Sequence, residues 1–114
     1  MYQGTLSPTT TQEDWKLIVE IDDEDTGEAL DLTGATIVFE VRDPKSRGIV
    51  LSATSNNGKI LILDTSIFQV LFVRSEMLGL VAQNYEVGCV LTVNGETKQY
   101  IIGSVPVLDG VVTQ

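Results

Sequence analysis

The chain has 114 residues and a formal net charge of −9, from 16 acidic and 7 basic side chains. This acidic balance argues against a nucleic-acid partner, because binding phosphates needs clustered lysine and arginine. The sequence contains no histidine, so it lacks the commonest general base and the commonest zinc ligand. No stretch approaches the roughly 18 consecutive apolar residues of a membrane span, so no membrane partner is expected.

A chain of this length is predicted to fold as one domain. Residues 1–13 are rich in threonine, serine and glutamine and show no hydrophobic periodicity, which predicts a flexible N-terminal arm that is ordered only when something binds it. The domain itself is predicted over residues 14–110, with a short tail at 111–114.

The first predicted strand covers residues 15–22. Its apolar side chains occupy every second position, as a half-buried strand requires, with a tryptophan at its head. These side chains are Trp15, Leu17, Val19 and Ile21. The acidic sequence DDEDTG follows and predicts a loop.

The segment 28–44 combines a turn, an alternating strand and a strand end. Asp31 and Thr33 are predicted to cap backbone amides in the turn. Ile37 and Phe39 begin the buried face of the strand, which continues at Val41. Pro44 ends it, because proline donates no hydrogen bond to a sheet.

The middle of the chain predicts three more strands. Residues 49–54 and 59–64 are expected to form a hairpin, because Asn57-Gly58 between them suits a two-residue turn. Residues 67–74 are apolar on both faces, which predicts a strand that is covered twice, once by its own core and once by another surface.

Residues 75–82 predict the one helix of the domain, of one or two turns, with Ser75 as its N-cap and Leu78, Leu80 and Val81 facing the sheet. The strand 85–94 then leads through Asn94-Gly95 into a hairpin partner that continues to Val107, with Gly103 as a predicted bulge or bend.

Seven or eight short strands with no repeating helix between them lack the crossovers of a parallel sheet. The predicted fold is therefore all-β: an antiparallel, immunoglobulin-like β-sandwich with one short helix.

The order of these features resembles a family of phage tail and baseplate domains, represented by the N-terminal domain of the baseplate upper protein. The resembling segments are WKLIVEID, ALDLTGATIVFEVRDP, IFQVLFVRSEMLGL and NYEVGCVLTVNGETKQYIIGSVPVLDG, which together run from Trp15 to Gly110. The resemblance implies a virion structural protein, assembled in the host bacterial cytoplasm, that binds copies of itself and other tail or baseplate proteins. It implies no enzymatic activity and no cofactor.

Two candidate reactive sites are weak on their own chemistry. Cys89 falls on the apolar face of its strand, and an inert core thiol is favoured over a nucleophile. Five carboxylates lie within the seven residues 22–28 and are weak candidates for a hard cation such as calcium. They do not have the spacing of a calcium-binding loop, so a solvated acidic turn is favoured. The carboxylates are those of Asp22, Asp23, Glu24, Asp25 and Glu28.

Two further sets of residues suggest binding. Trp15, Tyr85 and Tyr100 could form a sugar-stacking platform, which makes a carbohydrate-binding or adhesion module the alternative function, although core packing is favoured for the first two. Lys45 and Arg47 could pair with an acidic patch on a neighbouring copy, and two solvated cations are the favoured alternative.

The leading hypothesis is a non-enzymatic protein that self-associates, because one sandwich cannot use both apolar faces of its strands. The interface candidates are Phe68, Val70, Phe72 and Tyr100. The N-terminal arm could add to assembly by lying along the sheet edge of a neighbour.

Overall fold

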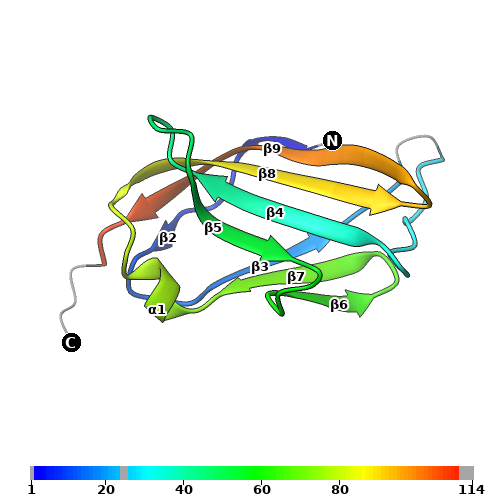
Figure 1. Cartoon of the computed structure of the whole chain (residues 1–114), viewed down its shortest axis with the longest axis horizontal. Helices are drawn as coiled ribbons and strands as arrows, with labels where there is room; N and C mark the ends of the chain where they lie inside the picture. The colour runs from blue at the N-terminus through cyan, green and yellow to red at the C-terminus, as the bar shows by residue number, and fades with distance from the viewer. Residues whose placement is uncertain (1, 24–25, 111–114) are drawn as a thin grey trace.

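The computed structural model describes residues 2–23 and 26–110, which form two stacked β-sheets and one short helix (Figure 1). The elements are β1 (Tyr2–Thr5), β2 (Thr9–Thr10), β3 (Trp15–Glu20), β4 (Thr36–Arg42), β5 (Ile49–Thr54), β6 (Ile60–Asp64), β7 (Ile67–Phe72), α1 (Arg74–Met77), β8 (Gln83–Val93) and β9 (Glu96–Leu108).

The larger sheet has the order β1-β9-β8-β4-β5, with β2 also on β9, and the smaller sheet has the order β3-β7-β6. Within the described residues, all pairs are antiparallel except those of β1 and β2 with β9. Strands β3, β6 and β7 take the places of strands B, D and E of an immunoglobulin domain, and β4, β8 and β9 take those of C, F and G. The predicted immunoglobulin-like sandwich is confirmed.

The core lies between the sheets and follows the predicted alternation. Ile37, Phe39 and Val41 of β4 are fully buried, as expected. Trp15 of β3 stacks on Phe72 of β7 with ring centroids 5.7 Å apart and meets the edge of Phe39 from the opposite sheet at 5.9 Å. This aromatic cluster therefore joins both sheets.

A second stabilising contact lies where the chain enters β8. The hydroxyl of Tyr85 donates to the carbonyl oxygen of Val81 at 2.8 Å and accepts the Val81 N–H at 3.1 Å. This is the tyrosine corner of immunoglobulin-like domains, which fixes the turn before strand F. The side chain of Tyr85 is buried, so these bonds satisfy its only polar atom.

The predicted N-terminal arm has a partner within its own chain. β1 pairs in parallel with β9 from Tyr2 opposite Ile101 to Thr5 opposite Ser104, and β2 pairs with the end of β9. The sequence does not predict these two strands, because backbone hydrogen bonds hold them and they have no alternating apolar side chains. These two short strands raise the strand count of the described residues to nine.

Gly103 is not the bulge that the sequence predicts. The extra residue in β9 is Tyr100, because Cys89 pairs with Ile101 while Val90 pairs with Gln99. Gly103 instead lets β1 approach: a Cβ atom added to it would lie 2.0 Å from the carbonyl oxygen of Gly4. The glycine is needed for contact between strands.

The predicted hairpin at Asn57-Gly58 is wrong in its pairing. β5 pairs with β4 in the larger sheet and β6 pairs with β7 in the smaller one, so the turn carries the chain from one sheet to the other. The side chain of Asn57 holds this crossing by accepting the N–H groups of Thr54 and Lys59 at 3.0 and 3.1 Å. By contrast, Asn94-Gly95 does form the predicted hairpin between β8 and β9.

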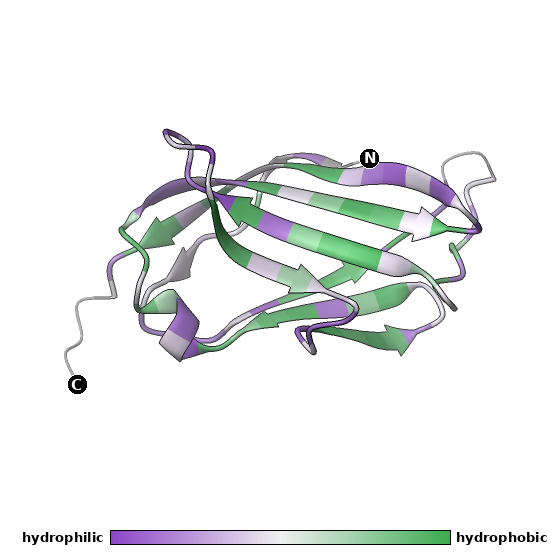
Figure 2. Cartoon of the chain, in the orientation of Figure 1, coloured by the Kyte–Doolittle hydropathy of each residue, from purple (hydrophilic) through white to green (hydrophobic). Residues whose placement is uncertain are grey.

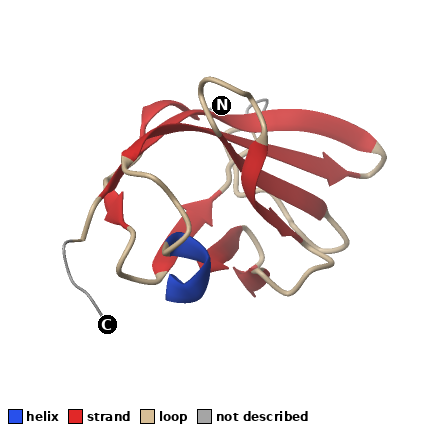
Figure 3. Ribbon diagram, turned by 60° about the vertical axis from the view of Figure 1, so that its left-hand side comes forward, coloured by secondary structure: helices blue, strands red, loops and turns tan. Residues whose placement is uncertain are grey.

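The helix has one turn, within the one or two turns predicted, but it begins earlier than predicted. Its N-cap is Val73 rather than Ser75, and it ends at Met77, whose side chain is fully buried. Leu78 and Val81, which were expected to face the sheet, are 42% and 71% exposed. α1 follows β7 at one end of the sandwich (Figure 3), where its single turn has room to bury one side chain.

Replacing Gly103 by alanine is expected to displace β1 from β9, because the new methyl group would overlap the Gly4 carbonyl. The free energy of unfolding should fall by roughly 1–3 kcal/mol, the range for overpacking. Thermal denaturation measures the loss, and hydrogen exchange should show faster exchange in residues 2–5.

The matched control is Gly79→Ala, since a Cβ there has its nearest neighbour 4.0 Å away. Equal stability of the two variants would contradict the assigned role of Gly103.

Candidate functional site

The outer face of the three-stranded sheet carries an apolar patch. Its central row crosses the sheet from Ile18 through Gln69 to Leu61, which are paired neighbours on β3, β7 and β6. Ile18 is 58% exposed and Leu61 is 56% exposed. The half-buried side chains of Ile67 and Leu71 lie on the same face of β7, on either side of Gln69. We call Ile18, Leu61, Ile67 and Leu71 the outer patch.

Opposite charges flank the outer patch along the strand direction. Lys16 pairs with Leu71 at one end, and Glu20 pairs with Ile67 at the other. Asp64 of β6 also pairs with Ile67, so the second end carries two carboxylates. The face therefore has apolar side chains around Gln69, a basic side chain at one end and acidic side chains at the other.

Strand β6 adds further apolar surface beside the patch. Ile62 and Leu63 are 45% and 46% exposed, although Ile62 is in phase with the core-facing side chain of Phe68. β6 is an edge strand, so part of its inward face extends past the opposing sheet. Figure 2 shows β6 as a mainly hydrophobic strand at the margin of the molecule.

The outer face of the larger sheet is polar by comparison. It carries two ion pairs, Arg42 with Glu40 of the same strand at 3.0 Å and Arg47 with Glu86 at 2.8 Å. The loop that carries Arg47 is tied down by a hydrogen bond from the Arg42 guanidinium to the Arg47 carbonyl oxygen. Of the two outer faces, the one on β3-β7-β6 is the better candidate for burying apolar surface against a partner.

The predicted interface residues of β7 face the other way. Phe68 and Phe72 are fully buried and Val70 is 1% exposed, so all three belong to the core of this chain and the prediction that they form an interface is wrong. The predicted alternation along β7 is confirmed, but the face that was predicted to form an interface is the one that packs in the core. The aromatic side chains fill the space between the sheets, and the side chains left outside are those of the outer patch.

The three aromatic residues considered as a sugar platform do not come together at the surface. Trp15 and Tyr85 are buried at 7% and 2% exposure, as their phase on the strands predicts. Tyr100, the fourth interface candidate, is half-buried and packs against the core from the bulge in β9. No shared ring surface results from these positions.

The acidic loop has the backbone of a turn. Asp22 bridges to Ala29, and the N–H of Asp23 donates to the carbonyl oxygen of Glu28 at 2.7 Å. Asp25, another cation candidate, lies outside the described residues, as does Glu24. Within residues 2–23 and 26–110, no three acidic or cysteine side chains gather closely enough to hold a metal ion.

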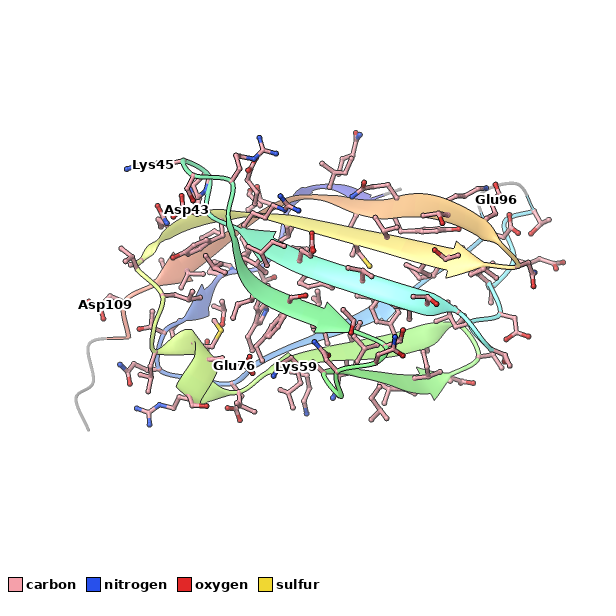
Figure 4. The ribbon with its side chains drawn as sticks, in the orientation of Figure 1. Asp43, Lys45, Lys59, Glu76, Glu96 and Asp109 are labelled. Atoms are coloured by element: carbon pink, nitrogen blue, oxygen red, sulfur yellow. The ribbon has the colours of Figure 1, made fainter. Side chains whose placement is uncertain are left out.

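Two carboxylates outside that loop cap turns. The Thr33 N–H donates to Asp31 Oδ1 at 2.9 Å, which confirms the predicted cap by Asp31. The Thr33 hydroxyl and N–H hold the pKa of Asp31 below its ordinary value. The N–H groups of Lys45 and Ser46 do the same to the pKa of Asp43. Lys45 itself sits on the exposed loop after Asp43 (Figure 4), while Arg47 is paired with Glu86 of its own chain.

No helix in the described part of the chain is long and apolar enough to cross a membrane. In comparisons with known proteins, no protein-family model and no curated protein matches this chain. The candidate site is therefore defined by its geometry.

Cys89 is a core residue, as the sequence predicts. Its side chain is fully buried, and burial raises the pKa of the thiol from 9.0 to about 12. A thiol that stays protonated is a poor nucleophile, because the thiolate is the reactive form.

The raised pKa predicts a loss of stability at alkaline pH. Between pH 9.0 and about 12 the unfolded thiol ionises while the folded thiol keeps its proton, so the free energy of unfolding should fall as the pH rises. Below pH 9 this contribution is constant. Denaturant titrations of the wild type and of Cys89→Ala from pH 7 to roughly pH 10.5 measure it, since the variant has no thiol to titrate.

The difference in unfolding free energy between the two proteins should shrink above pH 9. A difference that stays constant across the range would contradict the assigned burial of the thiol.

Proposed function

We propose that this chain is a non-enzymatic structural protein of a phage or prophage tail or baseplate, which acts through protein–protein contacts and self-association. The single observation that carries the self-association is the outer patch: an exposed apolar row on one sheet, flanked by opposite charges. Exposed apolar clusters of this kind mark interfaces more often than scattered apolar residues do.

The charges define how two copies would meet. Two outer faces can stack about a two-fold axis that lies between the two sheets and runs across their strands, so that the strands of the two copies are antiparallel. In this arrangement Ile18 and Leu61 each meet the same residue of the other copy. The same operation brings Lys16 of one copy over Glu20 of the other, twice. Such a self-complementary contact is isologous, which is the usual symmetry of a homodimer.

The outer patch supports a weak contact in isolation. Fully burying an exposed side chain of this kind contributes about 1.5–3 kcal/mol, and these four are already partly covered. The patch is also small beside the roughly 800 Å² per partner of a stable interface. We therefore expect dissociation constants of about 10 μM to 1 mM, strengthened in a particle where neighbouring subunits raise the effective concentration.

The setting in a virion tail rests on the resemblance between residues 15–110 and phage baseplate domains. The sandwich fold is compatible with that resemblance, and many other proteins share this fold, so it does not by itself define a function. Repeated weak contacts between copies suit a particle component, because many such contacts act together.

Leu61→Lys is expected to abolish self-association, because it places a charge at the β6 end of the central row, where Leu61 meets its own counterpart in the proposed contact. Sedimentation equilibrium between about 10 μM and 1 mM should show a mass that rises with concentration for the wild type and a constant monomer mass for the variant. The matched control is Ile102→Lys, which changes the charge equally at a site 47% exposed on the other sheet. A wild-type mass that stays monomeric throughout, or equal effects of both variants, would rule out the patch.

Exchanging the charges tests the antiparallel arrangement. Lys16→Glu should weaken self-association roughly threefold to tenfold, because it places carboxylate against carboxylate across the interface. Adding Glu20→Lys to the same chain should restore it, since the pair is then reversed but complete. Circular dichroism should show that both variants are folded. If the double variant then does not regain self-association, the antiparallel packing is excluded. Whether the chain self-associates through the patch is still decided by the Leu61→Lys experiment.

A further inference from the structure

One edge of strand β3 is unpaired in the described part of the sandwich. Among the described residues, β3 pairs with β7 on one side and with no strand on the other. The N–H of Ile21 donates to the carbonyl oxygen of Ser66, on the β7 side, at 2.9 Å. Since backbone groups alternate along a strand, those of Ile18 and Glu20 are directed to the unpaired edge. Beyond the end of β7, the Ile21 carbonyl accepts the Leu30 N–H.

A cleft runs along this edge. One part, of about 540 Å³, is lined by every residue from Leu17 to Asp23 and, on its far side, by Leu6, Tyr100 and Ile101. Because consecutive residues line it, the cleft follows the backbone of β3 rather than one face of the sheet. A second part, of about 560 Å³, continues from Leu17 to Trp15 and on to Glu13. Leu6 and Leu17 line both parts, so they form one groove.

The rim of the groove is acidic. Among the described residues that line its two parts, five are carboxylates and one is a lysine. The carboxylates are those of Glu13, Asp14, Glu20, Asp22 and Asp23, and the lysine is Lys16. An occupant that complements this rim has to carry positive charge.

We propose that the β3 edge binds an extended segment of a different protein, with apolar residues at alternate positions and lysine or arginine between them. The segment adds a strand to the β3-β7-β6 sheet. Its backbone pairs with Ile18 and Glu20, its apolar side chains enter the groove beside Leu17, and its cations meet the acidic rim. This is strand addition, in which backbone hydrogen bonds give affinity and side-chain pockets give specificity.

The charge argues against the N-terminal arm of a second copy as the occupant. Residues 1–14 contain two carboxylates and neither lysine nor arginine, so the arm would bring like charge to the rim. The other edge of the same sheet is also less suited to strand addition, because β6 has an irregularity between Ile62 and Asp64. Bulges of this kind block pairing at sheet edges, whereas β3 keeps an unbroken register along its six residues.

The test uses a synthetic peptide of roughly eight residues that alternates valine and lysine, long enough to span a strand of this length. It is titrated into the full chain and followed by nuclear magnetic resonance. Binding should slow hydrogen exchange at the amides of Ile18 and Glu20. Methylating the backbone nitrogens that face β3 should weaken binding roughly tenfold or more, because the hydrogen-bond donors are lost.

The protein variants separate the groove from net charge. Asp22→Lys should weaken binding roughly threefold to tenfold. The control Asp109→Lys also raises the formal charge from −9 to −7, a −1 becoming +1, but Asp109 lines neither part of the groove. Figure 4 places Asp109 at the end of the molecule where β3 begins, whereas Asp22 follows the other end of β3. Its effect should be smaller than twofold.

The proposal is overturned by any of three results: no binding of the peptide at millimolar concentration, equal binding of the methylated peptide, or equal effects of the two variants. It does not depend on self-association. Repeating the titration with Leu61→Lys should give the same affinity, so a failure of the outer patch and a failure of the groove are distinguishable.

Discussion

The contact on which this structure depends is the aromatic cluster of Trp15, Phe39 and Phe72. It joins β3 and β7 of one sheet to β4 of the other, with ring centroids 5.7 to 6.3 Å apart. Antibody domains link their sheets with a disulfide between strands B and F, but this chain has one cysteine and cannot do so. Core packing takes the place of that disulfide, and each aromatic pair contributes roughly 0.5–1.5 kcal/mol beyond its buried area.

The cluster also decides which surfaces are left for function. Because Phe72 and Phe68 must face inward to meet the opposite sheet, the alternate side chains of β7 are directed outward. On the larger sheet, ion pairs such as Arg47 with Glu86 make the corresponding face polar. On the smaller sheet, Ile18 and Leu61 are more than half exposed among the described residues, so the apolar outer patch follows from the same constraint that builds the core.

The two sheet edges beside the groove, those of β9 and β3, differ in whether a strand covers them. β9 is covered by the N-terminal strands, and Gly103 permits their close approach. The chain then crosses to begin β3, whose outer edge receives no strand from the described residues. An immunoglobulin-like domain often covers this edge with its first strand. Placing that strand on β9 instead leaves the groove beside Leu17, bordered by acidic side chains. The exposed apolar patch underlies the proposed self-association, and the unpaired β3 edge underlies the proposed binding of a basic segment.

Local pattern in the sequence determined most elements of this protein. Period-two alternation predicts the buried faces of β3, β4 and β8. The residues around Asp31 predict a turn, and Asn94-Gly95 predicts a hairpin. Each of these features depends on neighbours a few positions apart. Only the tertiary structure decided pairing and orientation. Asn57-Gly58 crosses between sheets, the arm finds β9, and Phe68 faces the core, because each of these depends on contacts between residues far apart in the chain. Alternation shows that a strand has two faces; which one is buried is set by the strands packed against it.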